Sequence, residues 1–303
     1  MINNFLITPG LGSSYLMGVM LSKYANGTCY SKGAFDKLAK IKNSNIILVK
    51  KFIRDPGQGD GYDPNIIQTL KKNNNKIIYI VIDGFACEQS RKDTIFIDSI
   101  KKYKDLYDLI LWPNKFTCEK YSHLGVSDTL YHLYDDKIKP NVAKEFNITY
   151  FGILRKDKVL FNEKVKQKLN VIDCCGDPAK QKIKPGCSSL TEELIKYSCH
   201  YSVRGKKFPE FTYGVNTKLS SAAASNANII CSRDKCFEEL LPEYDYYIDD
   251  VNNDSINEMY NRCEREFGTK NWIKNLQLLE KVKKETAPDI IGNKLNELIK
   301  KHL

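Results

Sequence analysis

The sequence lacks the features that mark membrane-spanning and exported proteins. No window approaches the ~18 consecutive apolar residues of a membrane span. The start of the chain, Met1 to Phe5, has no basic segment ahead of an apolar run. We therefore expect a cytoplasmic protein whose contact with membranes is at most peripheral.

Signatures of metal, nucleoside triphosphate and nucleic-acid sites are also missing. The ten cysteines form no Cys-x-x-Cys pair and are irregularly spaced, so we expect reduced thiols and no metal site. There is no Walker A motif, which disfavours a nucleoside triphosphatase. Nor is there an RRM, KH or zinc-finger motif that would support specific nucleic-acid binding.

The composition is that of a globular protein with an excess of positive charge. Of the 303 residues, 42% are hydrophobic, and this length corresponds to two domains of about 150 residues each. Lys and Arg number 47 against 37 Asp and Glu, a net charge of +10. This charge favours anionic partners such as a phosphorylated small molecule, a membrane surface or a nucleic acid. Plain solvation is the commoner role of scattered lysines such as Lys71-Lys72 and Lys300-Lys301.

Apolar runs alternate with amphipathic stretches in both halves of the chain, and a polar stretch from Tyr134 to Pro140 separates the halves. Such alternation predicts parallel sheets with right-handed crossovers. We expect two Rossmann-like α/β domains, residues 1–144 and 145–287, with a helix at 288–303 that crosses back to complete the first. The expected strands are 5–7, 45–50, 76–82, 108–112, 148–152, 170–174, 197–203 and 227–231. The expected helices are 15–24, 64–73, 92–107, 162–169, 191–196, 217–225, 255–267, 272–286 and 289–302.

Two such domains facing one another create a cleft at the carboxyl ends of their strands, where ligands usually bind in this architecture. Gly10 and Gly12 follow the first strand and would let a ligand approach the backbone beside a helix N-terminus. The stretch lacks the third glycine of the dinucleotide fingerprint, and a plain tight turn explains it about as well.

The most informative segment is Tyr213 to Arg233. We expect Asn216 or Thr217 to cap a helix whose first turn carries Lys218. A phosphate would there meet backbone N–H groups, a hydroxyl and an ammonium together. A capped alanine-rich helix needs no ligand, however, and spacing alone leaves both interpretations open.

The run from Asn216-Thr217-Lys218-Leu219 to Ile229-Ile230-Cys231-Ser232-Arg233 resembles the C-terminal donor-binding segment of GT-B glycosyltransferases. Three further stretches are similar to that family: a strand with trailing basic residues at 151–156, a strand ending in glycine at 172–177, and the stretch after the donor strand at 237–241. The resemblance covers residues 148–250 well and the first half only in topology.

The resemblance implies a GT-B fold and transfer of a hexosyl-type sugar from a nucleoside-diphosphate sugar to a carbohydrate or lipid-linked glycan, without an obligatory metal. It places Lys218 and Thr217 on the diphosphate, with Arg155 or Arg204 assisting, although an Arg on a loop is usually solvated or salt-bridged. The full set of expected donor-binding residues is Gly10, Gly12, Gly152, Arg155, Gly176, Ser202, Arg204, Asn216, Thr217, Lys218 and Ser221.

One position departs from the family. Many members carry a glutamate early in this helix that holds the donor, and the aligned residue here is Ser221. Either a hydroxyl substitutes for the carboxylate or the donor is seated differently. The alternative interpretation is a non-catalytic nucleotide-sugar or glycan-binding protein of the same fold, and retaining or inverting stereochemistry is left open.

Two residues are candidates for catalysis. Asp83 ends the strongest strand of the first half and would take a proton from an acceptor hydroxyl, although an Asp before Gly also forms turns. His200 lies near the expected donor site and would hydrogen-bond a sugar or phosphate, with a buried structural histidine as the alternative. In a front-face retaining reaction the donor phosphate itself could assist, and no protein base would be required.

Overall fold

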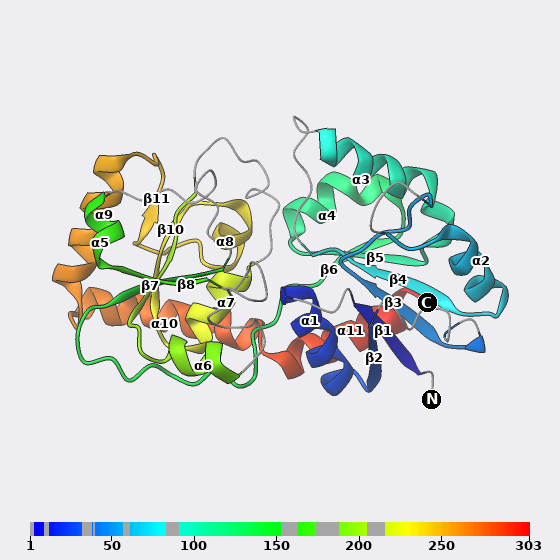
Figure 1. The fold of residues 1–303 in the computed structure, drawn as a ribbon, viewed down its shortest axis with the longest axis horizontal. Coiled ribbons are helices and arrows are strands. Elements are labelled where there is room, and N and C mark those ends of the chain that lie inside the picture. Colours follow the sequence, from blue (N-terminus) through cyan, green and yellow to red (C-terminus); the bar gives the residue numbers. More distant parts are fainter. Residues whose placement is uncertain are drawn as a thin grey trace. The chain divides into compact units, whose positions relative to one another are not determined.

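A computed structural model describes residues 3–8, 12–31, 38, 40–56, 61–82, 91–152, 163–173, 188–204 and 216–303 of the chain. The chain divides into two compact units (Figure 1). The first is built mainly from Met1–Leu133 and Pro288–Leu303, and the second from Tyr134–Phe211 and Asn216–Ala287. The resemblance to GT-B glycosyltransferases implies that residues 1–144 form the acceptor-side domain and residues 145–287 the donor domain, and this assignment stays a prediction.

The first unit contains a six-stranded parallel sheet in the order β2-β1-β3-β4-β5-β6 (Figure 1). Its central strands are continuous runs of buried aliphatic residues, the pattern expected where helices cover both faces of a parallel sheet. The strands are β1 (Asn4–Thr8), β2 (Gly27–Ser31), β3 (Asn45–Val49), β4 (Lys76–Ile80), β5 (Leu109–Trp112) and β6 (Ser127–Thr129).

Helices of the first unit pack on its sheet through two separate apolar clusters. One cluster joins the sheet to α1 and α11 through side chains such as Met17 and Leu295, and the other joins it to α2 and α3 through Ile67 and Phe96. The Cβ of any residue replacing Gly292 would come within 2.6 Å of the Tyr24 Cβ, so glycine permits the close approach of α11 to α1. The helices are α1 (Gly12–Tyr24), α2 (Pro64–Lys72), α3 (Arg91–Lys102), α4 (Lys115–Tyr121) and α11 (Pro288–His302), with 3-10 turns η2 (Lys104–Leu106) and η3 (Ser122–Leu124).

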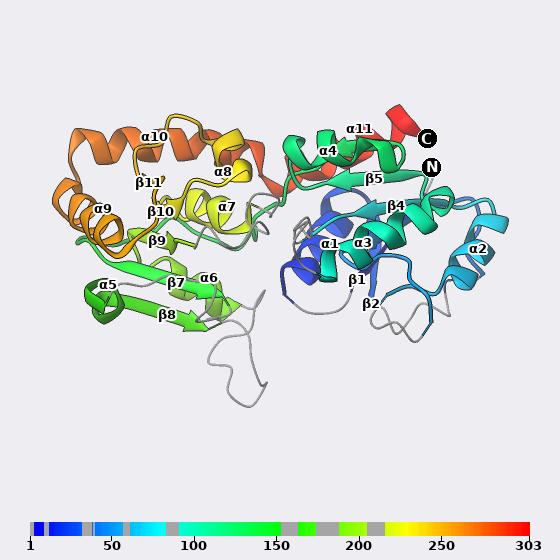
Figure 2. The same cartoon turned by 90° about the horizontal axis from the view of Figure 1, so that it is seen from above.

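The second unit contains a five-stranded parallel sheet in the order β11-β10-β9-β7-β8. Helix α10 lies along α7 and β10 (Figure 2), and its Trp272 joins an aromatic cluster with Phe146, Tyr246 and Phe267. The strands are β7 (Ile148–Gly152), β8 (Leu169–Asp173), β9 (Cys199–Ser202), β10 (Asn228–Ser232) and β11 (Tyr247–Ile248). The helices are α5 (Glu163–Lys168), α6 (Ser188–Leu194), α7 (Thr217–Ala224), α8 (Lys235–Leu240), α9 (Asn253–Glu266) and α10 (Lys270–Glu285).

The prediction of two parallel α/β sheets is confirmed. Within the described ranges, no helix combines the length and the apolar character needed to span a membrane.

Candidate functional site

The structure places most of the expected donor-site residues at the carboxyl end of the five-stranded sheet. Gly152 ends β7, Ser202 ends β9 and Arg204 lies just beyond it, while Thr217 begins α7. Gly12 begins α1 in the first unit. Four further expected residues, Gly10, Asp83, Arg155 and Gly176, lie outside the described residues, and their roles stay predictions.

The start of α7 differs from the expected capping arrangement. The structure places Asn216 at the N-cap position, but its side chain makes no capping hydrogen bond. Its φ of −80° and ψ of 16° depart from the extended conformation in which a cap oxygen faces the first helical N–H groups. The Asn216 amide instead contacts the Ser220 hydroxyl. The Asn216 side chain therefore does not occupy the first N–H groups of α7, the end of a helix that attracts anions.

Lys218 lies in the first turn of α7 and reaches the end of β7. Its Nζ is 3.7 Å from the centroid of the Tyr150 ring and 5.9 Å from that of Phe151. Gly152 adopts a φ of +129°, which L-residues with a side chain rarely adopt. A Cβ at Gly152 would lie 3.4 Å from the Tyr150 hydroxyl and 3.7 Å from the Lys218 Cε. The glycine thus lets the chain turn directly beside the lysine.

Three buried polar atoms of this region have no hydrogen-bond partner among the described residues. They are the Nδ1 of His200, the Oγ of Ser202 and the Oγ1 of Thr217. His200 and Ser202 are only 1% and 2% exposed. They lie two residues apart along β9, which places both on the same face of the sheet. Buried polar atoms are nearly always paired in folded proteins, so each of these three atoms has an unused capacity to bind a water or ligand atom.

The hydrogen bonding of His200 determines its chemistry. Its Nε2 is 3.3 Å from the Ser225 Oγ, and that hydroxyl donates to the carbonyl of Ala222. Because a hydroxyl has one hydrogen to donate, the tautomer with the proton on Nε2 and Nδ1 as acceptor satisfies both contacts. Burial, with the charge of Lys218 as a smaller cause, lowers the pKa of His200 to about 3. The imidazole is neutral near pH 7 and can accept a hydrogen bond from a hydroxyl or an N–H group.

Asp234 is a residue of this edge that the sequence did not single out. It follows β10 and caps α8, accepting a hydrogen bond of 2.8 Å from the Phe237 N–H. Burial raises the pKa of Asp234 to about 7, although that hydrogen bond and the charge of Arg204 oppose the shift. The charge of Arg204 thus acts on a carboxyl at the end of β10. The Asp-x-x-Phe spacing after a strand indicates a helix cap, but it carries no sign of the burial that shifts the pKa.

Ser221, at the position where many GT-B glycosyltransferases carry a glutamate, is buried within α7. Its carbonyl accepts a hydrogen bond from the Ser225 N–H, as in a regular helix. A glutamate would need to place a longer, charged side chain in this buried position.

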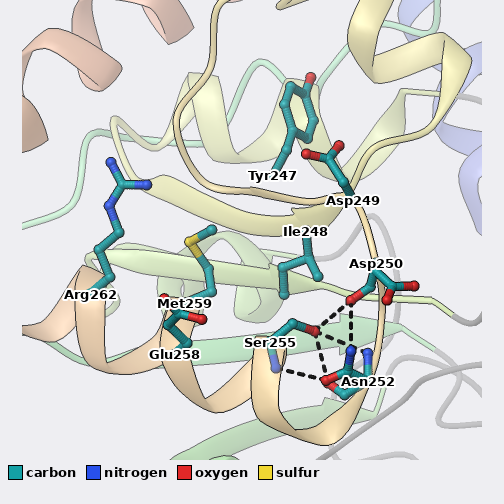
Figure 3. Close-up of a pocket in the computed structure, with 9 residues that line it drawn as sticks. All are labelled: Tyr247, Ile248, Asp249, Asp250, Asn252, Ser255, Glu258, Met259 and Arg262. Atoms are coloured by element: carbon teal, nitrogen blue, oxygen red, sulfur yellow. Dashed lines mark hydrogen bonds between the residues drawn. The ribbon is translucent and has the colours of Figure 1, made fainter.

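A separate hollow of about 270 Å³ lies between β11 and α9. Asn252 and Ser255 form the α9 capping box there, and both side chains also donate to the backbone carbonyl of Asp250, whereas Arg262 lies further along the helix (Figure 3). Arg262 is bound by Glu266 and the carbonyl of Asp245. Because these polar groups serve the helix cap and an ion pair, the hollow gives no indication of a ligand.

In the part of the chain that the structure describes, no group of three or more His, Cys, Asp or Glu side chains is arranged to hold a metal ion.

No family model matches the sequence, and no curated protein matches it. Solved structures do match over nearly the whole chain. HepE of Anabaena, in complex with UDP-glucose, has a TM-score of 0.65 at 8% identity, with 99% of this chain and 100% of that chain covered. A glycosyltransferase involved in avilamycin A biosynthesis has a TM-score of 0.59 at 9% identity, with 100% and 98% covered.

A third similar structure is an α,α-trehalose-phosphate synthase (UDP-forming) from Burkholderia xenovorans, with a TM-score of 0.60 at 10% identity, covering 92% of this chain and 77% of that chain. These likenesses show the fold. The chain has the GT-B fold, as the resemblance of residues 148–250 predicted.

Proposed function

We propose that the protein is a glycosyltransferase that moves a hexosyl group from a nucleoside-diphosphate sugar to a carbohydrate or glycoconjugate acceptor. The observation that carries the proposal is the start of α7, where an ammonium and N–H groups without a side-chain cap meet at the carboxyl end of a parallel sheet. In a GT-B fold, this is where a diphosphate would gain the most from the protein.

Each group at this edge has a distinct part in the proposal. Lys218 and the first N–H groups of α7 neutralise the diphosphate, with Thr217 and Ser202 donating from their hydroxyls. Arg204 adds a second positive charge from the end of β9. His200, as a neutral acceptor, receives a hydrogen bond from a sugar hydroxyl or from a water that bridges to the donor.

Metal independence is part of the same proposal. The charges that Lys218 and Arg204 would supply are those that a divalent cation supplies to a leaving diphosphate in other transferases. Turnover should therefore be the same in EDTA and in magnesium. A rate that depends on added metal would contradict this part of the proposal.

For proton transfer we propose Asp83, which directly follows the last described residue of its segment, Ile82. A carboxylate at that position would accept the proton of an acceptor hydroxyl. His200 contributes no proton transfer near pH 7 in this proposal, because its pKa lies at about 3. Asp83→Asn should leave UDP binding unchanged while lowering the transfer rate, and equal loss of both would contradict the assignment.

The binding test compares two lysines of the second unit. Calorimetric titration of the protein with UDP, GDP and dTDP identifies the nucleotide, and Lys218→Met should weaken its binding by about tenfold or more, the effect of losing a charge-assisted hydrogen bond. Lys166→Met removes an exposed lysine of α5 that pairs with Glu163 and serves as the matched control. Equal affinity in the Lys218 and Lys166 variants would remove Lys218 from the site.

A transfer assay separates the proposal from the alternative of a non-catalytic binding protein. The preferred nucleotide sugar, incubated with a panel of carbohydrate and lipid-linked acceptors, should give up its sugar. Tight binding without transfer or donor hydrolysis would favour the non-catalytic alternative. The basis of that alternative is Ser221, which stands where many GT-B glycosyltransferases carry a glutamate.

A further inference from the structure

Tyr150 is the residue of this edge for which no role follows from the sequence. It lies on β7, which pairs with β9 on one side and with β8 on the other. The residue is 3% exposed, and its backbone is in register with Val171 on β8. Its aromatic ring is therefore held at a fixed place in the second unit.

The Lys218 ammonium lies over the face of this ring. An ammonium within about 6 Å of a ring centroid is attracted by the negative face of the ring, and the distance here is 3.7 Å. Gly152 lies beside both groups, since a Cβ built there would be in van der Waals contact with the Tyr150 hydroxyl at 3.4 Å and with the Lys218 Cε at 3.7 Å, and its φ of +129° favours glycine. Tyr150, Gly152 and Lys218 thus form one unit, which we call the lysine seat.

A seat of this kind has a consequence for binding. A lysine side chain has four rotatable bonds and loses much rotamer freedom when it is fixed on a ligand. When the ammonium already lies on a ring at the end of the sheet, part of that loss has occurred before the ligand arrives.

We infer that Tyr150 is a positioning residue for anion binding: its ring holds the Lys218 ammonium at the carboxyl end of the sheet, ready for the diphosphate of a nucleotide sugar. The inference rests on the proposed function for the identity of the anion, whereas the seat itself is a property of the protein alone. Tyr150 acts through Lys218 and touches no reacting atom.

The seat is tested first without any ligand. In protein labelled with carbon-13 at the lysine ε position, the Lys218 signal, assigned with Lys218→Arg, should be shifted upfield by the ring. The shift should persist in Tyr150→Phe and disappear in Tyr150→Leu. A Lys218 signal at the position of exposed lysines in the unaltered protein would overturn the inference, whether or not the protein binds nucleotides.

The second measurement is the affinity for UDP. Tyr150→Phe keeps the ring and should bind within about twofold of the unaltered protein, whereas Tyr150→Leu should bind about fivefold more weakly. In the Lys218→Met background, Tyr150→Leu should change the affinity no further, because the two residues act as one unit. Additive losses would overturn the inference.

A fluorinated series covers the case in which Tyr150→Leu does not fold. Phenylalanines bearing an increasing number of fluorine atoms at position 150 keep the shape of the ring and reduce the negative electrostatic potential of its face. UDP should therefore bind progressively more weakly across the series. Constant affinity would overturn the inference. If the unaltered protein bound no nucleotide, the proposed function would fail, and the Lys218 signal would still decide whether the seat exists.

Discussion

Buried polar side chains at the amino ends of β1 and β3 differ in their hydrogen bonding from those on β9. In the first unit, Asn4 and Asn45 lie at the amino ends of β1 and β3, and both amides are paired: Asn45 Nδ2 donates to Asn4 Oδ1 over 2.9 Å, and Asn4 Nδ2 donates to the Ala25 carbonyl over 2.8 Å. In the second unit, His200 and Ser202 on β9 each have a buried polar atom without a partner among the described residues.

This difference separates structural polar groups from candidate functional ones. The hydrogen bonds of a paired amide in the interior offset the free-energy cost of its desolvation, and they help to fix the register of two strands. An unpaired atom costs free energy until something binds it. The unpaired atoms in β9 and at the start of α7 are thus the expected mark of a ligand site, and the paired asparagines are the mark of a scaffold.

The protein contains two tryptophans, and each reports on one unit. Trp112 is buried in β5 of the first unit and Trp272 in α10 of the second. In a Trp272→Phe background the fluorescence of Trp112 reports on the first unit, and in a Trp112→Phe background the fluorescence of Trp272 reports on the second.

The largest loss of stability is expected from breaking the paired amides. Asn45→Ala leaves the Asn4 Oδ1 without its buried donor, which should lower the free energy of unfolding of the first unit by about 2 kcal/mol. Urea unfolding followed by Trp112 fluorescence measures the change. A loss below about 0.5 kcal/mol would mean that the pair is not structural.

The next largest effect is expected at Gly152. An alanine there must adopt a φ of +129°, a strain of about 1–2 kcal/mol, whereas its methyl group would make only ordinary van der Waals contacts with Tyr150 and Lys218. We expect Gly152→Ala to destabilise the second unit by that amount in urea unfolding followed by Trp272 fluorescence. Gly268→Ala, at a glycine with a φ of +75° and open space around it, is the matched control, because this φ is close to the left-handed region that L-residues can enter at lower cost. A smaller loss at Gly152 than at Gly268 would contradict the expectation.

Asp234 should make the stability of the second unit depend on pH. Its pKa is raised to about 7 in the folded protein from 3.8. Between these values the folded state holds a proton that the unfolded state has lost, so the contribution of Asp234 to stability is fully present below about pH 4, falls between about pH 4 and pH 7, and stays at its low value above that. Asn also caps helices well. Asp234→Asn should therefore match the unaltered protein at pH 4 and exceed its stability by about 1 kcal/mol at pH 8, a value reduced for partial exposure.

Unfolding of the Asp234→Asn variant between pH 4 and pH 8, followed by Trp272 fluorescence, measures that difference. An unaltered slope against pH would assign the titration to other groups.

The smallest effect on stability is expected at Ser202. Its hydroxyl has no partner among the described residues, so Ser202→Ala should change the free energy of unfolding by less than about 0.5 kcal/mol, or raise it. The same variant should bind UDP about three- to tenfold more weakly, the effect of one lost hydrogen bond. A clear loss of stability without any loss of binding would show that Ser202 has a structural role, like Asn4 and Asn45, and would contradict the distinction drawn between the two groups.

The sequence predicted the central strands well because their aliphatic runs are bounded by polar residues. The expected strand at 45–50 corresponds to β3, and the one at 227–231 to β10. Three edge strands escaped prediction. β2 and β6 are short, polar and half-exposed, and β11 has two residues, so each is defined by pairing with a neighbour that a sequence pattern does not show.

For the helices, too, a clear sequence pattern decided which were predicted. Long amphipathic helices such as α9 and α10 were expected within two residues of their bounds. Among the short helices, α5 and α6 were expected, whereas α4 and α8 were missed. Asn114 and Asp234 cap the two missed helices, and fewer than two turns of helix give little periodicity to detect.

For the site, the sequence indicated the start of α7 and the end of β9 but not how they are arranged. Tyr150 and Asp234 escaped notice because their features, a ring beneath an ammonium and a raised pKa, arise from contacts between distant elements. Asn216 occupies the N-cap position, as one of the two expected candidates, but its side chain makes no capping hydrogen bond, because its backbone conformation depends on the whole turn. The roles of the donor-site residues and of Asp83 stay predictions.

The most direct test of the account is incubation of the purified protein with UDP-, GDP- and dTDP-sugars and a panel of acceptors, with release of the nucleoside diphosphate as the measured quantity. The account predicts release from one class of donor, unaffected by EDTA, strongly reduced in Lys218→Met and unchanged in Lys166→Met. Absence of both binding and release across the whole panel would contradict it.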